Sequence, residues 1–208
     1  MSRIAPLPVS EATDKAAQTY ERLQDFFGDR PLPDVFLPMG RVPAFLSDFY
    51  MNYKKFVASP GALDVATKAA IALAVSLKEG STVWSDFYTD HAKTHGLTDE
   101  QVAETAALVA TNAMYNTFFK FRELSGSDIF GGMSVGLRAH TFHGVSFDDK
   151  TVELINIAIS DLNACKPCVS GHVKKSRDLG IADEAIHEAV QCAAVVYAGV
   201  QFTKSAES

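Results

Sequence analysis

Cys165, Cys168 and His172 are the side chains of this 208-residue sequence whose types and spacing best fit covalent chemistry. In a helix, positions 165 and 168 are about one turn apart, and so are 168 and 172, so both thiols and the imidazole would share one face. The thiolate is the nucleophilic form of cysteine, and a nearby imidazole or a helix N-terminus favours it. The spacing therefore predicts a redox dithiol with its own base, in which Cys168 is the thiol nearest His172.

A stripe of polar residues precedes the dithiol. Its members recur at helical spacing on an otherwise apolar segment: Glu153, Asn156, Ser160 and Asn163. Solvent exposure is the simpler explanation of such a stripe. If the stripe is internal, the Glu153 carboxylate could orient and polarise His172 as the third member of a proton relay.

The elements that must position these residues are predicted to be helices, because nearly every long segment has a 3.6-residue apolar period and none alternates with period two. We therefore predict an all-α protein. A first helix is expected to begin at the N-cap candidate Ser10 and to stop at Gly28, and a second to run from Pro43 to about Ser59. The remaining helices are expected over 64–79, 82–95, 98–120, 148–162, 164–179 and 182–203, with a capping box at Thr98 and Gln101.

The sequence repeats itself at an offset of 84 residues. Residues 63–118 lie over 147–202 without a gap, so that Asp64 pairs with Asp148 and Gly96 with Gly180. Such self-similarity indicates a duplicated unit, here of three helices. We expect one compact domain with four parts: an N-terminal helical extension (1–60), a degenerate repeat (61–124), a linker (125–146) and a catalytic repeat (147–204).

The two repeats differ where chemistry would occur. The degenerate repeat lacks the dithiol and its histidine, and carries Ser81, Trp84 and Tyr88 in their places. Opposite the polar stripe it carries Ala69, Ala72 and Ser76, which a solvated face would not require. The comparison favours a buried stripe that is polar only in the working copy, and a core-packing role for Trp84.

Glu153, Cys165, Cys168 and His172 together make the pattern E-x11-C-x2-C-x3-H, which resembles the signature of the alkylhydroperoxidase D family within the carboxymuconolactone decarboxylase-like superfamily. The segment 180–189 is similar to the helix-turn-helix of that family. The resemblance covers 147–202 strongly and 63–118 weakly, and it implies an all-α fold.

The resemblance also implies a thiol-dependent peroxidase that acts on organic hydroperoxides in antioxidant defence. Cys168 would attack the peroxide, Cys165 would resolve the sulfenic acid to a disulfide, and Glu153 with His172 would relay the proton. It implies no bound cofactor: an external dithiol, on a lipoyl-bearing protein or another thiol donor, would reset the enzyme, with a peroxiredoxin as a further partner. A homo-oligomer is expected, with a trimer favoured over a dimer or hexamer.

Three other functions remain open from the sequence. Lys166 and Pro167 stand between the cysteines, where some family members have a histidine that assists proton transfer, and this favours a disulfide reductase or electron-transfer adaptor. A lactone decarboxylase, the other activity of the superfamily, needs no cysteine pair. A zinc-stabilised or redox-sensing module would need a fourth ligand, for which His140, His143 or Glu153 are candidates.

Other side chains have simpler interpretations. His91 and His95 are interpreted as solvated histidines at a polar helix end, and Cys192 as a buried core thiol. The cationic run at 174–177 is interpreted as complementing a helix dipole. His140 and His143 have no local partner, and the only role considered for them besides zinc binding is a place along a substrate channel.

Composition narrows the classes of partner. The net charge is −6, and no basic run is interleaved with aromatics, which argues against nucleic acid. The N-terminus lacks an apolar signal region and no apolar stretch could span a membrane, so we expect a cytoplasmic protein. Three cysteines are too few for a disulfide scaffold, which favours redox or metal chemistry for a C-x-x-C pair.

Overall fold

The computed structural model describes residues 3–207, and this part of the chain contains only helices and loops. The prediction of an all-α fold is confirmed. The α-helices are α1 (Asp14–Phe27), α2 (Pro43–Phe56), α3 (Val65–Glu79), α4 (Thr82–Thr94), α5 (Asp99–Leu124), α6 (Asp128–Gly131), α7 (Asp149–Leu162), α8 (Lys166–Asp178) and α9 (Asp183–Glu207). Short 3-10 turns lie at Val9–Glu11, Asp34–Phe36, Pro38–Arg41 and His140–Phe142.

One predicted boundary is wrong. Ser10 does not cap the first helix: it lies in a 3-10 turn, the chain is extended at Ala12 and Thr13, and α1 begins only at Asp14. The segment 125–146, predicted to be a linker, contains the four-residue α6 and a 3-10 turn. The capping box that begins α5 is confirmed, since Thr98 and Gln101 exchange both hydrogen bonds.

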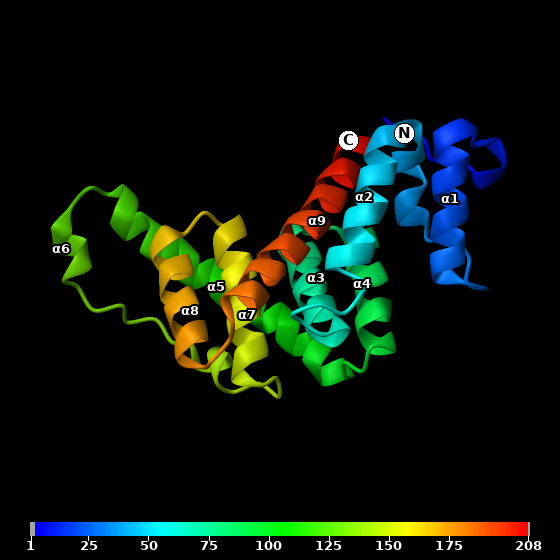
Figure 1. Cartoon of the computed structure of the whole chain (residues 1–208). Coiled ribbons are helices and arrows are strands. Elements are labelled where there is room, and N and C mark those ends of the chain that lie inside the picture. The colour runs from blue at the N-terminus through cyan, green and yellow to red at the C-terminus, as the bar shows by residue number, and fades with distance from the viewer. Residues whose placement is uncertain (1–2, 208) are drawn as a thin grey trace.

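Helices α3 and α7 form the centre of the molecule (Figure 1). Residues 68–76 of α3 and 151–160 of α7 are all buried. The two helices pack against each other, and each also packs against both long helices, α5 and α9. Because these helices have no exposed face along most of their length, the polar groups they carry must find partners inside the protein.

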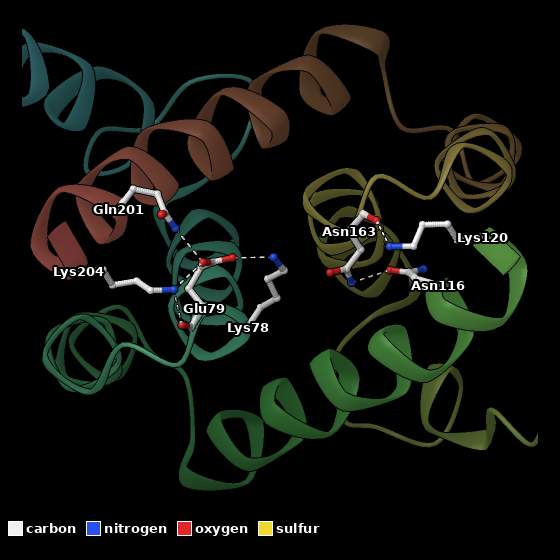
Figure 2. Close-up of polar contacts among 7 residues, drawn as sticks. All are labelled: Lys78, Glu79, Asn116, Lys120, Asn163, Gln201 and Lys204. Carbon is white, nitrogen blue, oxygen red and sulfur yellow. Dashed lines mark hydrogen bonds and ion pairs between the residues drawn. The ribbon is translucent and has the colours of Figure 1, made fainter. Parts of the chain in front are cut away.

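The two repeats are related by matching contacts at the helix ends. Lys120 of α5 donates to the carbonyl of Asn163 at the end of α7 (3.1 Å), and Lys204 of α9 donates to the carbonyl of Glu79 at the end of α3 (3.2 Å) (Figure 2). Both residues of each pair lie 84 positions from their counterparts. The long helix of each repeat thus satisfies a terminal carbonyl of the other repeat.

A second pair of contacts is similar. Glu104 of α5 accepts the backbone N–H of Ser146 just before α7 (2.7 Å), and Glu188 of α9, its counterpart in the repeat, accepts that of Leu63 just before α3 (2.8 Å), one residue beyond the counterpart of Ser146. The duplication predicted from the sequence is therefore visible in side-chain contacts as well as in helix order.

Aromatic side chains of the N-terminal segment cover the degenerate repeat. Trp84 is fully buried, its indole N–H donates to Thr203 (2.8 Å), and its ring lies against Phe36 and Phe49. Gly199 of α9 allows this approach, because a Cβ there would lie 2.8 Å from Phe49 and 2.9 Å from Trp84. The predicted core role of Trp84 is confirmed.

The catalytic repeat has no equivalent cover. The apolar residues 84 positions after Phe45 and Phe49 of α2 are Ile129 and Met133, which lie in and after α6, outside the gapless repeat, and are 65% and 55% exposed. Figure 1 shows α6 projecting from one end of the bundle, opposite the end formed by α1 and α2. Cys168, whose counterpart in the degenerate repeat is the fully buried Trp84, is itself partly exposed.

Candidate redox site

A tight turn between α7 and α8 presents the dithiol. Ala164 adopts a left-handed conformation (φ 51°), and the backbone N–H of Cys165 donates to the carbonyl of Ser160 (3.0 Å). Cys165 is the N-cap residue of α8, so Cys168 lies in the first turn of that helix. A helix N-terminus stabilises negative charge, so this position favours a thiolate at Cys168 when the cysteines are reduced.

The two cysteines are joined as a disulfide, with their Cα atoms 5.3 Å apart. Cys165 is fully buried, whereas Cys168 is partly exposed. Of the two sulfur-bearing residues, Cys168 is therefore the one that solvent and reactants can reach.

A buried carboxylate connects the histidine to a lysine. Glu153 of α7 is 1% exposed; its Oε2 lies 2.7 Å from His172 Nδ1 and its Oε1 accepts a hydrogen bond from Lys175 Nζ (2.8 Å). Burial raises the pKa of Glu153, but hydrogen bonds from His172 and Lys175 outweigh it and the pKa is lowered overall. A carboxylate at this position holds the imidazole with Nδ1 towards Glu153, which leaves Nε2 for proton exchange.

The polar stripe on α7 is buried and paired with amides of α5. Asn112 donates to Asn156 (2.8 Å), Asn116 donates to Ser160 (3.0 Å), and Asn163 donates to the side-chain oxygen of Asn116 (2.9 Å). The prediction of an internal stripe is confirmed, and α5 supplies its partners. These bonds fasten the end of α7, and with it the turn that carries Cys165.

An aromatic-walled pocket of about 340 Å³ opens beside the dithiol. The residues that line it are Tyr115, Asn116, Phe119, Phe142, Pro167, Cys168, Gly171 and His172. The ring of Phe142 meets that of His172 edge to face, with centroids 6.1 Å apart. The site therefore combines a sulfur, an imidazole and an apolar enclosure for a small organic group.

The structure brings all four predicted site residues together and adds others. Cys165, Cys168, His172 and Glu153 lie in or beside the pocket, and their chemical roles stay predictions. His140 and His143 were considered for a substrate channel, but both are exposed and neither lines the pocket; the residue between them that does is Phe142.

Lys175 and the aromatic residues of α5 are site components that the sequence interpretation missed. Lys175 was assigned to a cationic run at a helix end, yet it follows His172 by three residues and so shares its helix face. Tyr115 and Phe119 flank Asn116 on α5. The polar positions 112 and 116 on an apolar helix were a usable signal that this face of α5 meets the stripe of α7.

The interpretation of His91 as a solvated histidine is wrong. It packs against Phe87 and Tyr88, and burial, with His95 and Arg30, lowers its pKa to about 4. His95 is exposed as expected. Cys192 is confirmed as a core thiol: it is fully buried, and burial raises its pKa to about 12.

Metal and membrane sites were also sought. Within residues 3–207, no three side chains of His, Cys, Asp or Glu converge so as to hold a metal ion. In the same range no helix has both the length and the apolar character needed to cross a bilayer.

Comparison with known proteins identifies the family. Two relatives named alkyl hydroperoxide reductase AhpD, from Methylocella silvestris and Anaeromyxobacter sp. strain Fw109-5, are 27% and 28% identical over 157 and 166 residues. The matches cover 76% and 80% of this chain and 87% and 89% of the relatives. A solved structure of a candidate gamma-carboxymuconolactone decarboxylase subunit from Burkholderia xenovorans LB400 shares the fold, with a TM-score of 0.64, 16% identity, and coverage of 93% of this chain and 96% of that one.

The family model for carboxymuconolactone decarboxylases matches this chain twice, over residues 46–123 and 131–207. The two matches end at 123 and 207, which differ by the 84 residues of the internal repeat. The protein therefore belongs to the carboxymuconolactone decarboxylase family.

Proposed function

We propose that the protein is a thiol-dependent peroxidase that reduces organic hydroperoxides through its C-x-x-C dithiol. The observation that carries the proposal is the placing of Cys168, the exposed member of the disulfide, in one apolar pocket with His172, whose Nδ1 is held by Glu153. Relatives named alkyl hydroperoxide reductase support the same activity.

The reaction begins from the reduced dithiol. His172 accepts the thiol proton of Cys168, and the thiolate attacks the terminal oxygen of the hydroperoxide. An S–O bond forms as the O–O bond breaks, and the alkoxide takes the proton from His172 and leaves as an alcohol. Cys168 is then a sulfenic acid, and attack by the Cys165 sulfur forms the disulfide and releases water.

The shape of the site indicates the substrate class. The rings of Tyr115, Phe119 and Phe142 form an apolar wall next to Cys168, so an alkyl or aryl group is bound more favourably than a charged one. The pocket volume of about 340 Å³ suits a small organic group and not a polymer.

Turnover needs an external dithiol. An incoming thiolate can reach Cys168 and not the buried Cys165, so it attacks Cys168 and Cys165 is the leaving group. A lipoyl-bearing protein or another thiol donor fits this role, and a peroxiredoxin would accept the electrons in a series of thiol–disulfide exchanges. A homotrimer remains our proposal for the assembly.

A disulfide-exchange adaptor is the second candidate function. Lys166 and Pro167 are both exposed beside Cys168, which leaves space for a protein substrate at the disulfide. The decarboxylase activity of the family is a third candidate, and it predicts turnover of a lactone by protein whose cysteines have been replaced.

Stopped-flow oxidation of the reduced protein tests the proposal. An organic hydroperoxide should oxidise it faster than oxidised lipoamide or a protein disulfide does. Cys165→Ser protein should consume one equivalent of peroxide and stop at the sulfenic acid, whereas Cys168→Ser protein should not react. Faster oxidation by the protein disulfide would favour the adaptor, and faster reaction of Cys168→Ser than of Cys165→Ser would reverse the roles of the two cysteines.

A further inference from the structure

We propose that Lys175 is a positioning residue of the redox site, whose ammonium holds the Glu153 carboxylate against His172 and so favours the thiolate of Cys168. The proposal rests on the dithiol chemistry described above and concerns how that chemistry is tuned. It assigns to Lys175 a role that its position in a cationic run at the end of α8 does not suggest.

The geometry gives each oxygen of Glu153 its own partner. Oε2 meets His172 Nδ1 at 2.7 Å and Oε1 meets Lys175 Nζ at 2.8 Å. The Lys175 side chain is 39% exposed and that of Glu153 only 1%, so the lysine reaches inwards from the surface to a buried charge. With both oxygens engaged, the carboxylate cannot rotate away from the imidazole.

The charge balance shows why the second partner matters. Among the described residues, the charged or titratable groups hydrogen-bonded to Glu153 are His172 and Lys175, both from α8. From its own helix comes the neutral amide of Asn156 (3.4 Å), which α5 in turn meets with the amide of Asn112. A buried carboxylate requires a compensating positive charge, and the Lys175 ammonium supplies one beside Oε1.

Without Lys175, the Glu153 carboxylate would keep His172 as its only hydrogen-bond partner on α8 and Oε1 would lose its cation. The carboxylate would be held less firmly against the imidazole, and the lost positive charge would leave the site more negative, which disfavours a thiolate at Cys168.

The degenerate repeat supports the assignment independently. At the positions of Glu153 and Lys175 it carries Ala69 and His91, so both members of the ion pair are replaced together. His91 is half-buried, and burial with His95 and Arg30 lowers its pKa to about 4, so it needs no carboxylate beside it. A lysine that served only the helix dipole would not be expected to change together with a residue on another helix.

The test is the rate of alkylation of Cys168 by iodoacetamide as a function of pH, in reduced protein with Cys165→Ser. Lys175→Met removes the charge, Lys175→Gln retains a hydrogen-bond donor without charge, and Lys175→Arg retains the charge. Lys174→Met is the matched control, because the ion-pair partner of Lys174 among residues 3–207 is Asp178, on the surface (2.6 Å).

We expect the midpoint of the rate–pH profile to rise by about one pH unit in Lys175→Met and Lys175→Gln, because a positive charge about two helical turns from Cys168 is lost and Glu153 is left with His172 as its charge partner. Reactivity on the acid side of the profile should then fall about tenfold. Lys175→Arg and Lys174→Met should follow the parent. Thermal unfolding of each variant establishes that it is folded. If Lys175→Met is not folded, Lys175→Gln, which retains a hydrogen-bond donor, provides the test.

A profile of Lys175→Gln that superimposes on the parent would overturn the proposal, as would an equal shift in Lys174→Met. Alkylation requires no peroxide, so the outcome is separate from that of the proposed function. If the profile moves but hydroperoxide is not reduced, the positioning role stands and the peroxidase assignment falls.

Discussion

Glu153 is an ionised side chain in the most enclosed part of the site. Its burial would ordinarily favour the neutral acid, yet two partners on α8 lower its pKa and keep it charged. Since the folded-state pKa is depressed, the group stabilises the fold above its unfolded pKa, and this contribution is lost as the pH falls through the folded value. The carboxylate is thus maintained by the same contacts that orient the imidazole.

Replacement of this carboxylate should affect rate more than fold. Glu153→Gln is expected to slow oxidation of Cys168 near neutral pH by about 10²–10⁴-fold, because positioned proton transfer is worth this much. The measurement is the second-order rate constant with an organic hydroperoxide. Glu79→Gln is the matched control: Glu79 is also an ion-paired carboxylate, bonded to Lys78 and Lys204, but it lies in the degenerate repeat (Figure 2). A full-rate Glu153→Gln protein would show that the buried stripe serves packing alone.

The chemistry-bearing residues could be predicted from spacing because they lie on two helices at fixed intervals. Phe142 and Lys175 could not be found so easily. Phe142 reaches the pocket through a loop whose path no periodicity describes, and Lys175 resembles any surface lysine until the burial of its partner is known. The burial of Glu153 depends on tertiary packing, and the comparison of the two repeats was the feature of the sequence that indicated it.

At the scale of the elements, the α7–α8 turn places a residue with a Cβ in a backbone conformation that favours glycine. Ala164 adopts φ 51°, a conformation that costs residues with a Cβ about 1–2 kcal/mol, and its counterpart Gly80 ends α3 at φ 68°. The degenerate repeat therefore uses the residue that suits the turn, and the catalytic repeat does not.

Ala164→Gly is expected to stabilise the protein by about 0.5–1 kcal/mol, the relief of the left-handed alanine less the greater chain entropy of glycine. Urea unfolding of the oxidised protein, with parent and variant in the same redox state, measures the difference. The reverse change in the other repeat, Gly80→Ala, should destabilise by a similar amount. If Ala164→Gly lowers the free energy of unfolding, the alanine methyl must make contacts that outweigh its backbone cost.

Helix positions were predictable over the duplicated region because apolar period and repeat agree there. The start of α1 was predicted less well: it moved from Ser10 to Asp14, because residues 9–11 form a separate 3-10 turn and the chain is extended at Ala12 and Thr13.

The whole molecule consists of two halves: a covered half, which is the degenerate repeat under aromatic side chains, and an open half, which is the repeat that carries the dithiol. The aromatic cluster over Trp84 fills the degenerate repeat, whereas Cys168, at the position equivalent to Trp84, is partly exposed. Trp84→Ala should therefore cost about 3–5 kcal/mol, as truncation of a buried aromatic residue does.

Chemical denaturation measures this cost, and peroxidase activity measured along the same transition should be lost only as the protein unfolds. Trp84→Phe, which retains most of the volume, should be affected less. If Trp84→Ala unfolded at the parent's midpoint yet lost turnover, Trp84 would belong to the active site and the two halves would not divide structure from chemistry.

Trp84 is also the only tryptophan in the chain. Its intrinsic fluorescence consequently originates from the covered half alone, while a thiol-reactive dye on Cys168 would emit from the open half. A single sample therefore carries two spectrally distinct fluorophores, one in each half. Unfolding followed at both wavelengths would show whether the two halves unfold together or one after the other.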